Sequence, residues 1–449
     1  MIVSKFGGTS LADANQFRKV SKIIMENPSR RVIVVSAPGK RYKDDTKVTD
    51  LLINCAMAHY HNSTSDKELE EVINRYREIA MELNLSDKII DEIRQDIELR
   101  LAGNNINEAK YIDNLKASGE DNCAKLMAEY LRSIGLDANY ISPKKAGLFL
   151  SNESGNAQVL PDSYESLGKL AINPGIIVFP GFFGYTHEGE LVTFSRGGSD
   201  VTGSILAAAV KADLYENFTD VDSVYSVNPN IVANPKAIYE LTYREMRELS
   251  YGGFSVLHEE ALLPAYKENV PVKILNTNNP HCKGTLITTE RSSVNGPVVG
   301  IASDAGFCSI YVRKYLMNRE IGFGRKLLQI LEEEGLSYEH TPSGIDDISV
   351  ILREKQFNDH KEKIVIARIK SELAAEDVSV KRNLALIMIV GEGMRQSIGV
   401  AAKATKAFER ANVNLDMINQ GSSEVSMMFG VSASDEAQAV RALYEEFFE

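Results

Sequence analysis

Apolar residues in the first 290 positions alternate between short continuous runs and stretches in which they recur every three or four residues. Continuous runs are typical of strands covered on both faces, and the wider spacing indicates amphipathic helices. Strands are predicted at 1–6, 31–36, 172–184, 214–218 and 272–275, and helices at 13–26, 66–103, 120–134, 200–211, 242–250 and 258–268. This alternation predicts an open α/β sheet with helices on both faces.

The pattern changes after the polar connector at 288–293. Two successive stretches each run strand, helix, two strands, helix, which is typical of ferredoxin-like units. The predicted strands are 307–313, 336–341, 346–353, 376–381, 384–390, 413–419 and 424–431, and the predicted helices are 323–334, 357–374, 396–411 and 434–447. The second unit lacks a last strand, so we expect the apolar stretch 297–302 to cover its open edge. The first unit would then be inserted into the second.

Length and composition limit the number of domains and the kinds of partner that this protein can have. The 449 residues exceed what one hydrophobic core usually supports, so we expect roughly two or three domains. A formal net charge of −12 argues against nucleic acid or an anionic membrane as a partner. The four cysteines form no CxxC pair, and no motif with metal-ligand spacing is evident. Without a signal peptide or a long apolar run, we expect a cytoplasmic protein.

The first predicted strand is followed at once by Gly7 and Gly8. Glycine amides in front of a helix N-terminus form an anion site, and Lys5 adds a positive charge that can offset a phosphate. A strand edge with a tight turn and an ordinary lysine accounts for the same residues, so the motif by itself leaves both interpretations open.

A second glycine turn, at 195–202, also opens a helix. It contains Arg196, which suits bidentate binding of a carboxylate or phosphate, and Asp200, which we predict to be the N-cap. Asp220 follows a further strand, and Glu120 lies at a predicted helix start. The chain has no Walker, GxGxxG, zincin or GxSxG motif, so those enzyme classes are excluded.

Together these residues resemble the aspartokinases. The matching segments are KFGGTS at 5–10, VSA at 35–37, VTDLL at 48–52, SGE at 118–120, GF at 181–182, RGGSD at 196–200, TDVDSVY at 219–225 and VLH at 256–258. The resemblance covers the whole chain, because this family carries two C-terminal ACT domains, one threaded into the other. It implies an amino-acid-kinase α/β/α sandwich, of the carbamate-kinase-like type, at 1–290. It also implies an inserted ACT domain at 307–382 and a second one formed by 297–304 and 383–449.

The resemblance implies a monofunctional, lysine-sensitive aspartate kinase that uses ATP with Mg²⁺. The enzyme would phosphorylate the β-carboxylate of L-aspartate to give 4-phospho-L-aspartate, the first step of lysine, threonine and methionine biosynthesis. We expect feedback by lysine, with or without threonine, and a homodimer or homotetramer assembled through the ACT domains.

The resemblance also implies roles for individual residues. The implied catalytic residues are Lys5 and Asp200, and the implied substrate contacts are Ser36, Thr49, Glu120, Phe182, Arg196 and Ser199. The implied nucleotide contacts are Lys5, Gly7, Gly8, Thr219, Asp220 and Tyr225, and the effector contacts are Met317, Glu320, Gly322, Gly324, Glu339 and Asp347. No metal ligand from the protein is implied.

The chain departs from the family on the nucleotide side. Asn228, Asn230 and Ser255 stand where many members carry a carboxylate, an arginine and a lysine. We expect rearranged ATP contacts, with Lys273 as a substitute charge. Two alternatives remain open. One is an enzyme of the same fold for another acidic substrate, such as glutamate, and the other is a non-catalytic amino-acid sensor.

Overall fold

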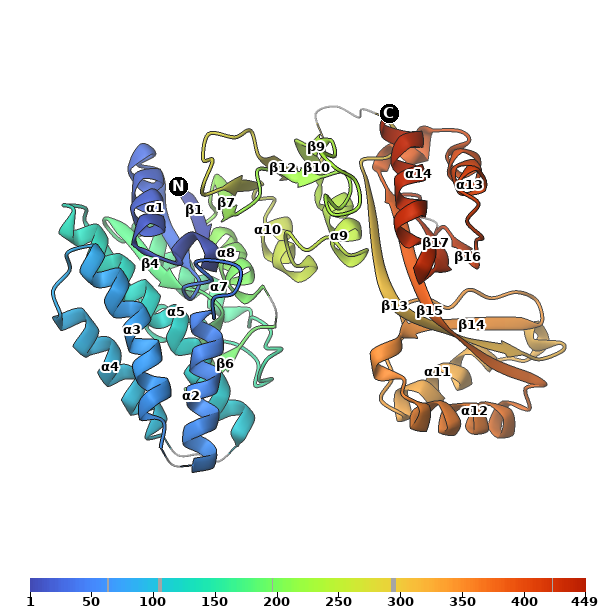
Figure 1. Ribbon diagram of the computed structural model, residues 1–449, viewed down its shortest axis with the longest axis horizontal. Helices are drawn as coiled ribbons and strands as arrows, with labels where there is room; N and C mark the ends of the chain where they lie inside the picture. Colours follow the sequence, from blue (N-terminus) through green and yellow to red (C-terminus); the bar gives the residue numbers. More distant parts are fainter. Residues whose placement is uncertain (63, 104–106, 196, 292–295, 422) are drawn as a thin grey trace. The chain divides into compact units, whose positions relative to one another are not determined.

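The computed structural model describes residues 1–449 apart from 63, 104–106, 196, 292–295 and 422 (Figure 1). The chain forms two compact units, each assembled from three segments. The first unit comprises Met1–Val224, Ala237–Arg247 and Ser255–Ser292, and the second comprises Tyr225–Lys236, Glu248–Phe254 and Ser293–Glu449. Among the helices of the described residues, none combines the length and the hydropathy needed to cross a bilayer.

An eight-stranded sheet forms the centre of the first unit, in the order β10-β12-β11-β7-β1-β2-β4-β3. The strands are β1 (Ile2–Phe6), β2 (Arg30–Val35), β3 (Ala138–Tyr140), β4 (Ile176–Pro180), β7 (Leu214–Thr219), β10 (Glu240–Thr242), β11 (Val272–Asn276) and β12 (Thr285–Thr288). Every neighbouring pair is parallel except β11 and β12. The core of β2 is fully buried on both faces, which explains its continuous apolar run.

Helices cover both faces of this sheet. The helices of this unit are α1 (Ala14–Glu26), α2 (Val48–Asn62), α3 (Asp66–Glu82), α4 (Lys88–Leu101), α5 (Glu108–Ser133), α6 (Pro143–Ala146), α7 (Asp162–Gly168), α8 (Gly198–Ala209) and α10 (Leu263–Lys267), and α9 (Tyr243–Tyr251) begins in it. Helices α1 to α5 share one apolar core with the sheet, whereas α8 packs on β1, β2 and β7 and is followed outward by α7 and α10 (Figure 1). The predicted α/β sandwich is confirmed.

The strand order reverses beside β1. After β1 the chain builds one side of the sheet through β2, β3 and β4, and it then crosses β1 to place β7 and β11 on the other side. At such a reversal, the connections at the carboxyl ends of the strands turn away from each other and leave room for a ligand. The carboxyl ends of β1, β2, β4 and β7 therefore form the candidate site.

The structure corrects several predicted helices. The single helix at 66–103 is two helices, α3 and α4, because the chain turns at Asn84 with a φ of 56°. Helix α5 starts much earlier than residue 120, with the side chain of Asn107 as its cap. The helix at 258–268 is a 3₁₀ turn, η3 (Glu259–Leu262), followed by α10.

Two further corrections concern the site. Asp200 is not the N-cap of α8: left-handed Gly197 (φ 75°) caps that helix, and Asp200 lies in its first turn. The apolar run at 172–184 is divided into β4 and β5 (Phe183–Tyr185), which pairs with β6 (Leu191–Thr193).

The second unit contains an antiparallel five-stranded sheet in the order β14-β13-β15-β17-β16. Its elements are β13 (Gly300–Arg313), β14 (Asp347–Arg353), β15 (Asp377–Val390), β16 (Met417–Asn419), β17 (Ser426–Ser432), α11 (Phe323–Glu333), α12 (Asp359–Leu373), α13 (Val400–Arg410) and α14 (Glu436–Phe448). Helices α11 and α12 enclose one apolar core, and α13 and α14 enclose another (Figure 1).

Two long strands join these halves. The stretches predicted as separate strands at 297–302 and 307–313 form the single strand β13, and those at 376–381 and 384–390 form β15. The first part of β13 pairs with the last part of β15, from Gly300 opposite Val390 to Ala305 opposite Ala385. The predicted strand at 336–341 does not form, and only an isolated bridge joins His340 to Ile351.

Candidate active site

A buried lysine lies at the carboxyl end of the central strand. The Lys5 ammonium is 2.5 Å from a carboxylate oxygen of Asp200 on α8. Asn217 of β7 stands opposite Lys5 in register; it accepts a hydrogen bond from Lys5 at 3.4 Å and donates one to Asp200 at 2.9 Å. The three side chains thus form a compact polar cluster, with Lys5 only 7% exposed.

The turn after β1 is shaped by close backbone contacts. The carbonyl of Gly8 accepts a hydrogen bond from the amide of Gly39 at 2.8 Å. A β-carbon on Gly8 would come within 2.9 Å of the Ala37 carbonyl, and one on Gly39 within 2.6 Å of the Gly8 carbonyl carbon. Only glycine therefore lets the loops after β1 and β2 touch at this point.

Glu120 presents a carboxylate oxygen that lacks a partner. The residue is 7% exposed, and its Oε2 atom has no hydrogen-bond partner within the described part of the chain. Burial raises the pKa of this carboxyl to about 8, against the opposing effects of the Ala37 amide and the Lys116 charge. Helix α5 approaches the loop after β2 because Gly119 has no β-carbon, which would lie 2.8 Å from that of Ala37. A buried carboxylate in this condition favours a cationic ligand.

The end of β4 is fastened to the start of α8. Phe182 has a φ of 76°, and its amide donates a hydrogen bond to Thr202 at 3.0 Å. A β-carbon on Gly181 would lie 2.6 Å from the hydroxyl of Ser199, and one on Gly198 would lie 2.8 Å from the Phe182 ring. These contacts hold Phe182 in a left-handed conformation that L-residues rarely adopt, and they position Ser199 beside the strand end.

Four of the other predicted contacts lie at this edge of the sheet. Ser36 directly follows β2 and its amide donates to the Phe6 carbonyl at 3.2 Å, while Thr49 lies in the first turn of α2. Thr219 ends β7 and donates a hydrogen bond to the neighbouring Asp220 at 3.3 Å.

For two predicted contacts, no place in this cluster is described. Arg196 is outside the described residues. Tyr225, in β8 (Val224–Tyr225), is counted with the second unit.

Asn217 and Gly39 were missed by the sequence reasoning. An asparagine inside a strand and a glycine in a long polar loop carry no local signal of function. The alignment of β7 with β1 would have pointed to Asn217, because strand partners in register lie side by side.

Comparisons with known proteins identify the family. The amino acid kinase family matches residues 1–276, and the ACT domain matches residues 387–447. Aspartokinase 3 of Bacillus subtilis is 59% identical over 448 residues, which cover 100% of this chain and 99% of that protein. The chain belongs to the aspartokinases. The prediction of an aspartate kinase is confirmed, and the sensor and other-substrate alternatives are set aside.

Solved structures of aspartokinases have the same fold. Aspartate kinase of Clostridium acetobutylicum is 39% identical with a TM-score of 0.86, and both chains are covered completely. E. coli aspartokinase III in complex with lysine and aspartate is 26% identical with a TM-score of 0.78, again over the whole of both chains.

The register of the sheet shows on which face Lys273, the substitute charge predicted for the ATP site of this aspartokinase, lies. Lys273 of β11 is in register with Glu216 of β7, the neighbour of Asn217. Successive strand residues point to opposite faces, so Lys273 lies on the face opposite Asn217 and Lys5. Glu216 is itself bonded by Ser4 and Arg30 on that face. Lys273 is therefore not on the face that carries Lys5 and Asn217, and its contact with ATP stays a prediction.

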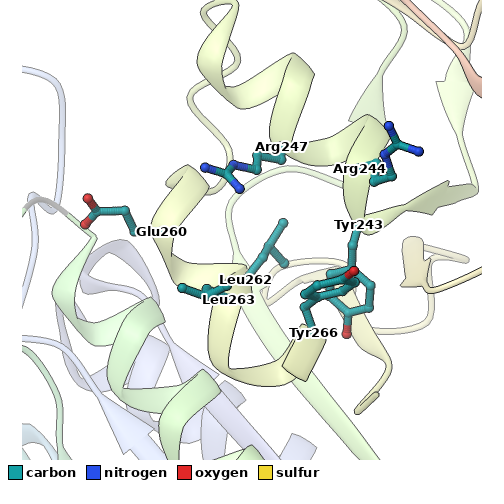
Figure 2. A pocket seen from close by; sticks show the side chains of 7 residues that line it. All are labelled: Tyr243, Arg244, Arg247, Glu260, Leu262, Leu263 and Tyr266. Carbon is teal, nitrogen blue, oxygen red and sulfur yellow. The ribbon is translucent and has the colours of Figure 1, made fainter. Parts of the chain in front are cut away.

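A second hollow of about 310 Å³ lies between α9 and the η3–α10 segment. Figure 2 shows Arg244 and Arg247 projecting from α9, with the rings of Tyr243 and Tyr266 together at one end. Among the described residues, its lining contains none of the predicted site residues, but Glu260 accepts a hydrogen bond from Ser195, in the glycine turn before α8, at 3.2 Å.

The predicted effector residues lie at two places in the second unit. Met317 is buried in the core under α11, Gly322 caps that helix with a φ of 82°, and Gly324 follows in its first turn. Glu320, two residues before the Gly322 cap, pairs with Lys314 and Lys326, which lowers its pKa.

Glu339 and Asp347 are placed differently. Glu339 accepts a hydrogen bond from Tyr251 and pairs with Arg353 at 3.4 Å. Asp347 begins β14 and lines a hollow of about 460 Å³ on the sheet, together with polar side chains such as Ser309 and Ser349. Of these two acids, Asp347 is the better placed to receive a cationic ligand.

Proposed function

We propose that the crevice beside β1 transfers the γ-phosphoryl group of ATP to the β-carboxylate of L-aspartate, giving 4-phospho-L-aspartate and ADP. The observation that carries this proposal is the buried Lys5 ammonium at the end of the central strand, next to the amides of Gly7 and Gly8. The Gly7 amide donates to the Phe218 carbonyl at 3.1 Å, so the positive charge of Lys5 and the Gly8 amide are the groups that suit the phosphate oxygens of a nucleotide.

The chemistry requires positioning more than proton transfer. The aspartate β-carboxylate is ionised at pH 7, so it attacks phosphorus without a general base. One carboxylate oxygen forms a bond to the γ-phosphorus as the bond to the bridging oxygen breaks, and ADP leaves with that electron pair. Lys5 offsets the charge on the transferring group, and Asp200 and Asn217 hold the Lys5 ammonium in place.

The substrate is recognised through its amino and α-carboxylate groups. Glu120 receives the ammonium, because its buried Oε2 atom otherwise has no partner among the described residues. Arg196 binds the α-carboxylate. Ser36, Thr49 and Ser199 donate further hydrogen bonds, and Phe182 closes the pocket beside them.

Thr219, Asp220 and Tyr225 contact the nucleotide. Within the described residues, no group of three His, Cys, Asp or Glu side chains could hold a metal ion. We propose that Mg²⁺ arrives on the ATP phosphates, the usual way in which this ion enters kinase sites. When bound, Mg²⁺ neutralises charge on the phosphate oxygens.

The second unit is proposed to regulate the first. We assign residues 1–290 to the catalytic domain, 307–382 to an inserted ACT domain, and 297–304 with 383–449 to a second ACT domain. The continuous pairing of β13 with β15 supports this nested arrangement. Lysine is the proposed effector, the homodimer or homotetramer the proposed assembly, and the first step of lysine, threonine and methionine biosynthesis the proposed role.

A kinase assay with a chemical trap tests the catalytic proposal. ADP release is measured with aspartate or glutamate, and the acyl phosphate is captured with hydroxylamine. Lys5→Met should lower kcat by at least about 100-fold, as expected when a positioned charge is removed. Lys22→Met, on the exposed face of α1, is the matched control. Turnover close to that of the parent protein in Lys5→Met would refute the assignment.

A further inference from the structure

A buried arginine lies directly behind the glycine turn. Arg75, on α3, is 5% exposed. Its guanidinium donates to the Asp45 carboxylate at 2.9 Å and to the carbonyls of Gly39 at 2.9 Å, Thr46 at 2.9 Å and Ala12 at 3.4 Å. One side chain therefore binds four acceptors from three places in the chain.

Those acceptors belong to the two loops that shape the phosphate site. Ala12 ends the 3₁₀ turn η1 (Gly8–Leu11), which starts at the second glycine of the motif. Gly39 and Thr46 belong to the loop between β2 and α2, and the Gly39 amide bonds the Gly8 carbonyl. Because Gly39 both touches Gly8 and is held by Arg75, the guanidinium controls how closely the two loops approach.

The charge on Arg75 is balanced within the same loop. The Asp45 carboxylate also accepts hydrogen bonds from Nε and Nη2 of Arg41, at 2.9 and 3.0 Å. The two arginines hold the pKa of the Asp45 carboxyl well below its usual range. Burial lowers the pKa of Arg75. Apolar residues often stabilise a fold as well as a buried ion pair does, so stability alone is a weak reason for this arrangement. A planar, five-donor guanidinium can bond several carbonyls at fixed angles, which a lysine cannot do.

We propose that Arg75 is a positioning residue for phosphoryl transfer: it holds the loops after β1 and β2 in the spacing that aims the Gly8 amide at the transferring group. The proposal rests on the function proposed above. Arg75 contacts the two loops through their backbone and Asp45, so its effect on the reaction is indirect.

Arg30 provides a matched comparison. It is a mostly buried arginine that pairs with Glu216 and donates to the Ile23 carbonyl, but it lies at the amino end of β2, at the opposite edge of the sheet. Arg75→Lys and Arg30→Lys keep the positive charge and remove the planar guanidinium group with its several donors. We expect Arg75→Lys to lower kcat by about 100-fold, as small misplacements of reacting groups do, with smaller changes in both KM values. Arg30→Lys should lose about as much thermal stability as Arg75→Lys but keep the kcat of the parent protein.

Gly39→Ala tests the same contact without touching a buried charge. The new β-carbon would lie 2.6 Å from the Gly8 carbonyl carbon and force the loops apart, so kcat should fall at assay temperatures where thermal unfolding shows the variant to be folded. Guanidinium ion should restore part of the activity of Arg75→Ala and none of that of Lys5→Met.

The outcomes separate this inference from the proposed function. Parental kcat in Gly39→Ala, or equal losses in Arg75→Lys and Arg30→Lys, would overturn the positioning role while the parent protein still phosphorylates aspartate. Failure of the parent protein to form the acyl phosphate would instead refute the function itself.

Discussion

Replacing Glu120 by glutamine should stabilise the ligand-free protein while weakening aspartate binding. The pKa of this carboxyl is raised from 4.5 to about 8 because burial disfavours its charged form. The free energy of unfolding therefore falls as the pH rises. The fall takes place between the pKa of this carboxyl in the unfolded chain and its pKa in the folded protein. Linkage gives a penalty of about 1 kcal/mol at pH 5 and about 4 kcal/mol at pH 8. These figures are upper limits for the variant, because the glutamine amide is also polar and buried.

Thermal unfolding at pH 5 and pH 8 measures this effect. With roughly 2–4 °C per kcal/mol for a unit of this size, Glu120→Gln should unfold roughly 5 to 10 °C higher than the parent protein at pH 8 and nearly together with it at pH 5. Glu129→Gln, on the exposed face of the same helix, is the control. Aspartate should stabilise the parent protein more than the variant, whose aspartate KM should rise about 10- to 100-fold with the lost charged hydrogen bond. An unfolding difference that does not change with pH would refute the reasoning.

Three further results are expected. Asn217→Ala should lower kcat by about tenfold, because Lys5 and Asp200 lose their shared hydrogen-bond partner; steady-state kinetics with unchanged turnover would contradict this. Ser255→Lys should lower the KM for ATP and leave that for aspartate unchanged, and an unaltered ATP KM would mean that Ser255 does not take the place of the lysine common in the family. Lysine should inhibit the parent protein and do so less in Asp347→Ala, as measured by initial rates and sedimentation; no effect of millimolar lysine on either would refute regulation through this site.

The glycine turns and strand ends of the site could be predicted from the sequence because their signals are local. An apolar run followed by Gly7 and Gly8 indicates a strand, a turn and a close approach within ten residues. The helix predicted at 66–103 was less accurate, because the break at Asn84 interrupts a pattern of apolar spacing that otherwise continues. The burial of Arg75 could not be predicted from this pattern, because an arginine in a helix rich in charged residues is usually solvated.

By itself, the sequence determined the order of strands and helices, the two kinds of domain and the residues of the motifs, because apolar period and glycine geometry act over short distances. Only the tertiary structure decided which distant residues meet. Parallel pairing of β1 with β7 brings Asn217 to Lys5, 212 positions apart in the chain, and the register of β11 on β7 puts Lys273 on the opposite face of the sheet. Burial, which is a property of the whole fold, decided that Glu120 has a raised pKa and that Arg75 bonds backbone carbonyls instead of water.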